Sequence, residues 1–285
     1  ATAAKIASSA LREALRAQKP SLDALITQKS QESREELKTL LQSAIQAANE
    51  AVLQAALNDK GLAGMASTME VVVLTVGHAM IGHVGDSRSF IVRGGDAHLL
   101  TEDHRVGIEM VKQGAWTPEV AAASPFGRTL TRAIGLSPYA RADFIDVEIA
   151  HGDTLVVCSD GIGETVPSKE IFQILNSAKG NVEVACAQLV SAAMAHKAKD
   201  NLTAIVISVE SGANQQQQKP GPIEAPPDQA DLLKKFNLVG KVPLFRYAGF
   251  SDINRLLSIA HGKILRKGEA IFKDGAHADS MLVLI

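Results

Sequence analysis

The chain has 285 residues, of which 46% are hydrophobic, and a formal net charge of −2, so it can bury one sizeable core or two domains. No basic stripe suited to nucleic acid is visible, and no apolar run reaches the length of a membrane span or resembles a signal peptide. These absences, with two cysteines (Cys158 and Cys186) expected to be reduced core residues, predict a cytoplasmic protein without nucleic-acid or membrane partners.

The first part of the chain has the pattern of helices. Apolar residues recur at helical spacing over residues 3–17 and over a longer stretch from about 33 to 56, with an interruption expected at Pro20. The sequence starts at Ala1 inside the first pattern and stops at Ile285 inside an apolar run. We therefore expect it to be a piece of a longer protein.

The next segments read as strands joined by short turns, at residues 71–76, 78–84, 90–93 and 98–100. Gly94-Gly95 between the last two is a strong hairpin signal. Strands that follow one another through short turns argue for antiparallel pairing. With helices before and after them, these strands predict an α+β fold and not a doubly wound parallel sheet.

Residues 104–137 interrupt the strand pattern. One short helix is expected from Val106 to a stop at Gly114, and Thr117-Pro118 favours the start of another. Beyond this segment we expect strands and helices in turn: strands at residues 143–149 and 155–158, helices over 167–175 and 182–195, and a closing strand over 202–209.

Three carboxylates stand at the ends of predicted strands: Asp86, Asp160 and Asp200. Taken alone, Asp160 is more simply interpreted as a turn residue that bonds its own backbone before Gly161. Together, carboxylates so far apart in sequence can converge only if the fold gathers them, and a cluster of them repels itself unless a cation neutralises it. Oxygen-only ligands favour Mg²⁺ or Mn²⁺ over zinc.

Five short motifs resemble a known family. In chain order they are Val84-Gly85-Asp86-Ser87-Arg88, Leu100-Thr101-Glu102-Asp103-His104, Leu130-Thr131-Arg132-Ala133-Ile134-Gly135, Cys158-Ser159-Asp160-Gly161 and Asp200-Asn201. They resemble the PPM family, the PP2C-type metal-dependent serine/threonine protein phosphatases, in its bacterial form. The resemblance implies a PP2C-like α-β-β-α sandwich of antiparallel sheets flanked by helices, a phosphorylated Ser/Thr protein as substrate, and residues 104–137 as the flap beside the active site.

The resemblance also implies roles for the acidic residues. Asp160 and Asp200 would be carboxylates of a binuclear Mg²⁺ or Mn²⁺ centre that activates water. Asp86 and Asp160, with Glu164, would hold a further, weaker ion, which gives two or three ions per site. The family usually has Asp at or near the position of Glu164, so this residue departs from the pattern.

A larger departure concerns the third carboxylate of the binuclear centre. In the family it comes from an Asp-Gly-x-Gly-Gly stretch, which this sequence does not contain, and an upstream phosphate-gripping Arg is missing as well. We therefore expect residues 1–285 by themselves to hold the metal pair poorly. Two alternatives stay open: a phosphatase, and a pseudophosphatase that uses the fold as a signalling or binding module.

Two polar residues beside the motifs have weaker claims to a chemical role. We expect Asn201 to orient Asp200 or cap its turn more than to ligate a metal. His104 is expected to bond locally in a turn, with a proton donor as the alternative.

The remaining candidates are arginines and histidines. A structural role is expected for Arg88, whereas Arg128 and Arg132 in the flap fit a phosphopeptide contact and a solvated surface equally. His78 and His83 are five residues apart in a predicted strand, which places them on opposite faces and argues against a ligand pair.

Composition divides the chain into three parts. They are a PP2C-like phosphatase domain at 1–210 without its N-terminal motif, a Gln/Pro-rich linker at 211–230, and a unit at 231–285. The last unit resembles the N-terminal part of a cyclic-nucleotide-binding domain with its first β-roll strands. That resemblance implies a regulatory domain and a cyclic nucleotide as its partner, with the phosphate-binding part beyond Ile285.

Overall fold

The computed structural model describes residues 2–210, 235–236, 238–239, 242, 245, 248 and 250–260. The predicted linker, and the β-roll strands expected after residue 260, lie outside the described residues. The division into a phosphatase domain, a linker and a cyclic-nucleotide-binding-like unit therefore stays a prediction.

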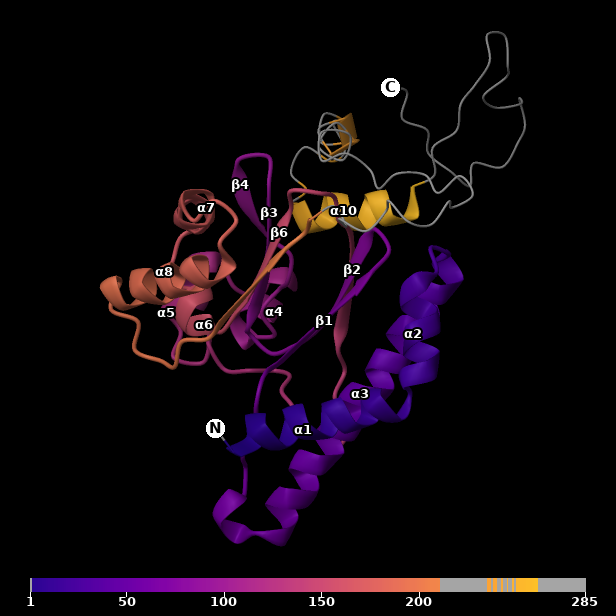
Figure 1. Cartoon of the computed structure of the whole chain (residues 1–285). Coiled ribbons are helices and arrows are strands. Elements are labelled where there is room, and N and C mark those ends of the chain that lie inside the picture. The colour runs from indigo at the N-terminus through magenta and orange to yellow at the C-terminus, as the bar shows by residue number, and fades with distance from the viewer. Residues whose placement is uncertain are drawn as a thin grey trace, which may run out of the picture.

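Two antiparallel sheets form the centre of the molecule, between two layers of helices (Figure 1). The first sheet has the order β1-β2-β5, with β1 at Met69–Thr75, β2 at His78–Val84 and β5 at Asp143–Glu148. The second has the order β4-β3-β6-β7, with β3 at Arg88–Arg93, β4 at Asp96–Leu99, β6 at Thr154–Cys158 and β7 at Ala204–Ser208. Every strand pairing in these sheets is antiparallel, which confirms the predicted α+β sandwich.

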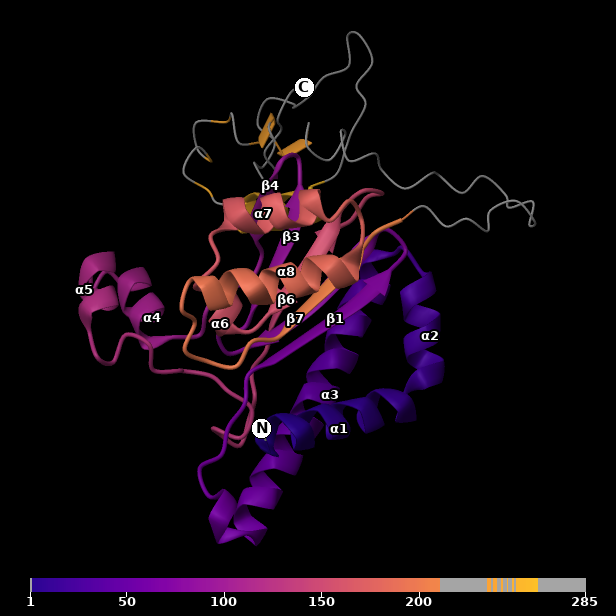
Figure 2. The same cartoon turned by 60° about the vertical axis from the view of Figure 1, so that its left-hand side comes forward.

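Helices cover the outer faces of both sheets. The first sheet is covered by α1 (Thr2–Ala17), α2 (Lys19–Thr27) and α3 (Gln31–Asn58), which the short η1 (Lys60–Leu62) follows. The second sheet is covered by α6 (Asp160–Gly163), α7 (Ser168–Ser177) and α8 (Val182–Ala195). The flap carries α4 (Val106–Lys112) and α5 (Pro118–Ala123), which stand apart from the sandwich in Figure 2. Within the described part of the chain, no helix is both long and apolar enough to cross a bilayer.

Helix α2 lies where the sequence predicted only an interruption. It begins at Lys19, so Pro20 is inside its first turn. The N–H groups of a first turn have no partner within the helix, and proline, which lacks this group, is therefore tolerated there. The chain changes direction between α1 and α2 (Figure 2), which a single turn residue, Gln18, separates.

The apolar faces of the two sheets meet in a common core. Ile81 of the first sheet lies in one buried cluster with Ile91 and Leu155 of the second. A second cluster forms beneath α3, where Leu41 and Ile45 are fully buried against the first sheet. This four-layer packing holds the strands in a fixed register, which in turn places the acidic residues.

The register brings the three predicted aspartates to one end of the sandwich. Cys158, the last residue of β6, pairs with the first residue of β3 on one side and of β7 on the other. Asp86 lies two residues before β3, Asp160 two residues after Cys158, and Asp200 four residues before β7. All three therefore lie where the second sheet ends.

One helix from the C-terminal part of the chain is described, α10 (Phe250–Ile259). Its Ile253 is buried, its Asn254 side chain donates to the Asp146 carbonyl oxygen at 3.0 Å, and the Phe250 ring stacks on His98 with 4.1 Å between the ring centroids. This helix therefore packs directly on β5 and β4 of the sandwich.

We expect Leu155→Ala to lower the free energy of unfolding by about 2–5 kcal/mol, because it removes a fully buried side chain between the sheets and leaves a cavity. Urea unfolding measures the change. The matched control is Leu57→Ala on α3, where the side chain is 76% exposed and the expected change is within about 0.5 kcal/mol. Equal losses in the two variants would contradict this core.

Candidate metal centre

The turn after β6 packs tightly against the loop before β7. The Ser159 hydroxyl donates to the Asn201 carbonyl oxygen at 3.1 Å and accepts from the Thr203 N–H at 3.1 Å. A Cβ added to Gly161 would lie 2.9 Å from the Asn201 carbonyl oxygen, so only glycine permits this approach. These contacts hold together the two segments that carry Asp160 and Asp200.

Each of these two aspartates has one oxygen held by the backbone. Asp160 Oδ1 accepts from the Gly161 N–H at 2.8 Å, and Asp200 Oδ1 accepts from the Asn201 N–H at 2.7 Å. The turn bond expected of a lone Asp-Gly is therefore present at Asp160. Both bonds orient the carboxylates, and Asn201 acts through its backbone, in agreement with the orienting role predicted for it.

A buried arginine lies among the acidic residues. The Arg105 Nε donates to Asp86 Oδ2 at 2.8 Å, and Nη2 donates to the same oxygen. Its Nη1 forms an ion pair with Glu164, and Nη2 lies 3.5 Å from Asp160 Oδ2. One guanidinium therefore gathers three of the four carboxylates that the sequence assigned to metal.

The acidic residues are close enough to influence one another's ionisation. The pKa of Asp160 is raised, first because burial disfavours the charged form and then because Asp86, Asp200 and Glu164 add negative charge nearby. The fold thus brings all four predicted residues together, and their roles as ligands stay predictions.

The position of Asp86 depends on the residue before it. Gly85 has a φ of +117°, and a Cβ there would lie 2.5 Å from Thr68 Cγ2, so another residue would not fit. Its N–H donates to His104 Nδ1 at 3.1 Å, and its carbonyl oxygen accepts from the His104 N–H at 2.7 Å. His104 therefore clamps the turn that presents Asp86.

These contacts define the tautomer of His104. A backbone N–H can only donate, so Nδ1 must accept, and the ring proton of the neutral imidazole lies on Nε2. Nε2 lies 3.2 Å from Asp143 Oδ2, to which its proton donates, and 3.2 Å from Arg132 Nη1, which itself donates to Asp143 Oδ1. Burial lowers the pKa of His104, which favours this neutral form. The local turn role predicted for His104 agrees with this geometry better than the role of a proton donor.

The two histidines of β2 have different partners. His78 Nδ1 lies 3.0 Å from Asp146 Oδ1, whereas His83 is fully buried with its Nδ1 hydrogen-bonded to Glu70. Residue Glu70 also accepts from the Ser89 hydroxyl at 3.0 Å. The arrangement agrees with the prediction that the two histidines are not a ligand pair.

Of the three arginines predicted as candidates, two form ion pairs outside the acidic cluster and one contacts the cluster. Arg88 holds both oxygens of Asp103, at 2.9 and 2.7 Å, and is structural as predicted. Arg132 pairs with Asp143 at 2.6 Å. Only Arg128 reaches the acidic cluster, where its Nη2 lies 2.6 Å from Glu164 Oε2.

Sequence reasoning missed Arg105, the residue in closest contact with the acidic cluster. It follows directly on the Thr101–His104 motif, and no local pattern distinguishes it from a surface arginine. The available signal was indirect: four acidic residues gathered at one place require positive charge, and Arg105 is the residue directly after the second of the five motifs.

The donor set fits a hard divalent cation, because it consists of carboxylates alone. The Asp160 side chain is 32% exposed, and its second oxygen lies 3.5 Å from Arg105 Nη2, beyond direct hydrogen-bond distance. Among the described residues, however, no group of three or more His, Cys, Asp or Glu side chains is arranged around one metal position. Asp86 and Glu164 point instead to Arg105.

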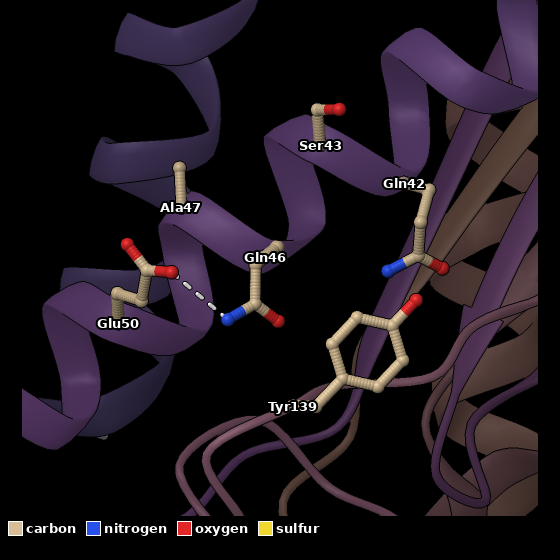
Figure 3. Close-up of a pocket in the computed structure, with 6 residues that line it drawn as sticks. All are labelled: Gln42, Ser43, Gln46, Ala47, Glu50 and Tyr139. Atoms are coloured by element: carbon tan, nitrogen blue, oxygen red, sulfur yellow. Dashed lines mark hydrogen bonds between the residues drawn. The ribbon is translucent and has the colours of Figure 1, made fainter.

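A hollow of about 350 Å³ lies beside α3 (Figure 3), and no residue of the acidic cluster lines it. Its lining is neutral apart from one carboxylate: Gln42, Ser43, Gln46, Ala47, Glu50 and Tyr139. The amides of Gln42 and Gln46 bond to the backbone at residues 138–142, and Gln46 also donates to Glu50 at 2.9 Å. These side chains therefore fasten a loop to α3, and the hollow is not a candidate active site.

Similar proteins of known structure share this architecture. The crystal structure of the serine/threonine phosphatase PstP/Ppp of Mycobacterium tuberculosis matches with a TM-score of 0.60 and 26% identity, covering 73% of this chain and 83% of that one. The catalytic domain of PstP in complex with two manganese ions matches with a TM-score of 0.58 and 25% identity, covering 73% and 82%. The sandwich with acidic residues at its end is thus the fold of a metal-dependent protein phosphatase.

The sequence comparisons define the family. The serine/threonine phosphatase stp of Listeria innocua serovar 6a is 31% identical over 173 residues, which are 61% of this chain and 68% of that protein. The family model described as Protein phosphatase 2C matches residues 1–206, more than two thirds of the chain. The chain therefore belongs to the protein phosphatase 2C family and is a metal-dependent protein serine/threonine phosphatase by class.

We expect His104→Ala to lower the free energy of unfolding by about 1–3 kcal/mol, because the buried Gly85 N–H loses its acceptor. His104→Asn is the matched control, since the Asn side-chain oxygen can replace Nδ1, and its loss should be smaller. Urea unfolding at neutral pH measures both. Equal losses would show that the acceptor at this position is not what stabilises the turn.

The lowered pKa of His104 predicts a dependence of stability on pH. Below the ordinary histidine pKa of about 6.5, the His104 ring binds a proton in the unfolded chain more readily than in the folded protein. The contribution of the neutral ring to stability is therefore complete above that value and is lost as the pH falls below it. Urea unfolding at a series of pH values should give a shallower slope for His104→Asn than for the unaltered chain. An unchanged slope would assign the dependence to other groups.

Proposed function

We propose that Asp160 and Asp200 hold a pair of Mg²⁺ or Mn²⁺ ions, at which the chain removes phosphate from phosphoserine and phosphothreonine in proteins. The observation that supports this most is the clamp between the turn after β6 and the loop before β7, which orients both carboxylates at one surface. Bound there, two divalent ions would supply a water nucleophile near neutral pH and neutralise the phosphoryl charge.

The residues around the centre have separate tasks. The Gly161 and Asn201 N–H groups each hold one oxygen of an aspartate, so that the other oxygen would bind the metal; for Asp160 this oxygen now lies 3.5 Å from Arg105 Nη2. A cation would also favour the ionised form of Asp160, whose pKa is raised in its absence by burial and by neighbouring negative charge. A positive charge at this position would therefore stabilise the ionised carboxylate of Asp160.

The flap is the proposed contact for the phosphorylated substrate. Arg128 stands at its base with an exposed side chain, paired with Glu164 at 2.6 Å, and Phe126 beside it is 67% exposed. A guanidinium next to an exposed aromatic ring suits a phosphorylated peptide, because arginine binds phosphate and the ring binds an apolar neighbour.

A second candidate function is a binding module built on the phosphatase fold. One observation favours it: Asp86 and Glu164 are paired with Arg105. A regulatory unit of cyclic-nucleotide-binding type at 231–285, its cyclic nucleotide ligand and a cytoplasmic location are proposals that rest on the sequence alone.

Titration calorimetry with Mn²⁺ tests this centre. If the centre forms in residues 1–285, the unaltered chain should bind Mn²⁺ with micromolar affinity and Asp160→Asn should weaken binding at least tenfold, since loss of even an outer partner costs about 10- to 100-fold. Hydrolysis of a phosphothreonine peptide with Mn²⁺ should be lost in parallel. The control is Asp96→Asn, an exposed aspartate in the β3–β4 hairpin. Millimolar or absent binding to the unaltered chain would contradict a working centre in residues 1–285 and favour the binding module.

A further inference from the structure

A positive charge is built into the acidic cluster. The Arg105 residue is only 8% exposed, and its five N–H donors lie in one plane that faces acidic side chains. Asp86 accepts two of these donors on one oxygen, at 2.8 Å from Nε, and Glu164 accepts another. Asp160 Oδ2 is 3.5 Å from Nη2.

These contacts divide the acidic residues into two groups. Asp86 and Glu164 make direct hydrogen bonds to Arg105, and the second oxygen of Glu164 accepts from Arg128. Asp160 and Asp200 have their direct hydrogen bonds to backbone N–H groups instead. Direct hydrogen bonds from arginine therefore hold Asp86 and Glu164, whereas Asp160 has only a longer ion pair with Arg105, 3.5 Å from its Oδ2.

The backbone around Arg105 holds it at this position. Arg105 precedes the first residue of α4 and forms an antiparallel bridge with Leu130, at the other end of the flap. The N–H of the next residue, Val106, donates to the Thr129 carbonyl oxygen at 2.9 Å. The side chain thus projects from the base of the flap, where the segments that enter and leave the flap are hydrogen-bonded to each other, and not from a free loop.

We propose that Arg105 is a resident cation that takes the place of a third metal ion at Asp86 and Glu164, so that the chain recruits divalent ions to Asp160 and Asp200 alone. The inference deepens the proposed function, because it rests on the same acidic cluster and sets its metal stoichiometry. It replaces the further ion that the family resemblance implies with a guanidinium on the flap.

A metal titration tests this directly. Arg105→Met keeps the length of the side chain and removes its charge, so it should bind one more Mn²⁺ per chain than the unaltered protein in titration calorimetry. Addition of Asp86→Asn to this variant should abolish the extra equivalent. Mn²⁺ should also raise the melting temperature of Arg105→Met by more than that of the unaltered chain.

The matched control is Arg93→Met. Arg93 is an equally buried arginine at the other end of β3, held by Asp153 at 2.9 and 2.5 Å, and its removal should leave the Mn²⁺ stoichiometry unchanged. An unchanged stoichiometry in Arg105→Met would overturn the inference. No Mn²⁺ binding to the unaltered chain would contradict the proposed centre, but a gain of one equivalent in Arg105→Met would still support the resident cation.

A second measurement decides the matter if Arg105→Met does not fold. In metal-free buffer, Asp86→Asn should lower the melting temperature, because it removes the partner of a buried arginine. If Asp86 instead awaited a metal ion, neutralising it would relieve repulsion from the other carboxylates and raise the melting temperature. A raised melting temperature would therefore overturn the inference.

Discussion

Repulsion between carboxylates is the constraint on which the end of the sandwich depends. Like charges about 4 Å apart repel by roughly 4 kcal/mol at an effective dielectric constant of about 20, a large part of a domain's net stability. The fold gathers Asp86, Asp160, Glu164 and Asp200 there in spite of this cost. The neighbouring elements are arranged to supply positive charge and N–H donors.

Two sets of hydrogen bonds to the backbone hold the segments that carry the aspartates in place. One joins the turn after β6 to the loop before β7 through Ser159, and the other joins Gly85 to His104. Both are built from neutral groups that bond to backbone, so they do not change the charge balance of the site. The imidazole thereby acts as a structural part of the turn.

The strands, the long helix α3 and the convergence of the aspartates could be predicted because apolar periodicity and strand ends are local signals. Helix α2 was missed because proline in a first turn resembles a break. Arg105, and the buried pair of Glu70 with His83, could not be predicted in their roles. Their contacts join segments 13 to 59 residues apart, and only the packing of the two sheets shows which charges are buried together.

The strand β7 completes the second sheet and is also the last of its strands in the chain. While a ribosome is still synthesising the residues beyond β6, the apolar strand Thr154–Cys158 has an unpaired edge, a template for unwanted pairing with other chains. Arrival of β7 closes this edge and at the same moment delivers the loop with Asp200 to Asp160. Pairing of the β6 edge and assembly of the acidic site are therefore one event, and a nascent chain cannot display the site before β7 has joined the sheet.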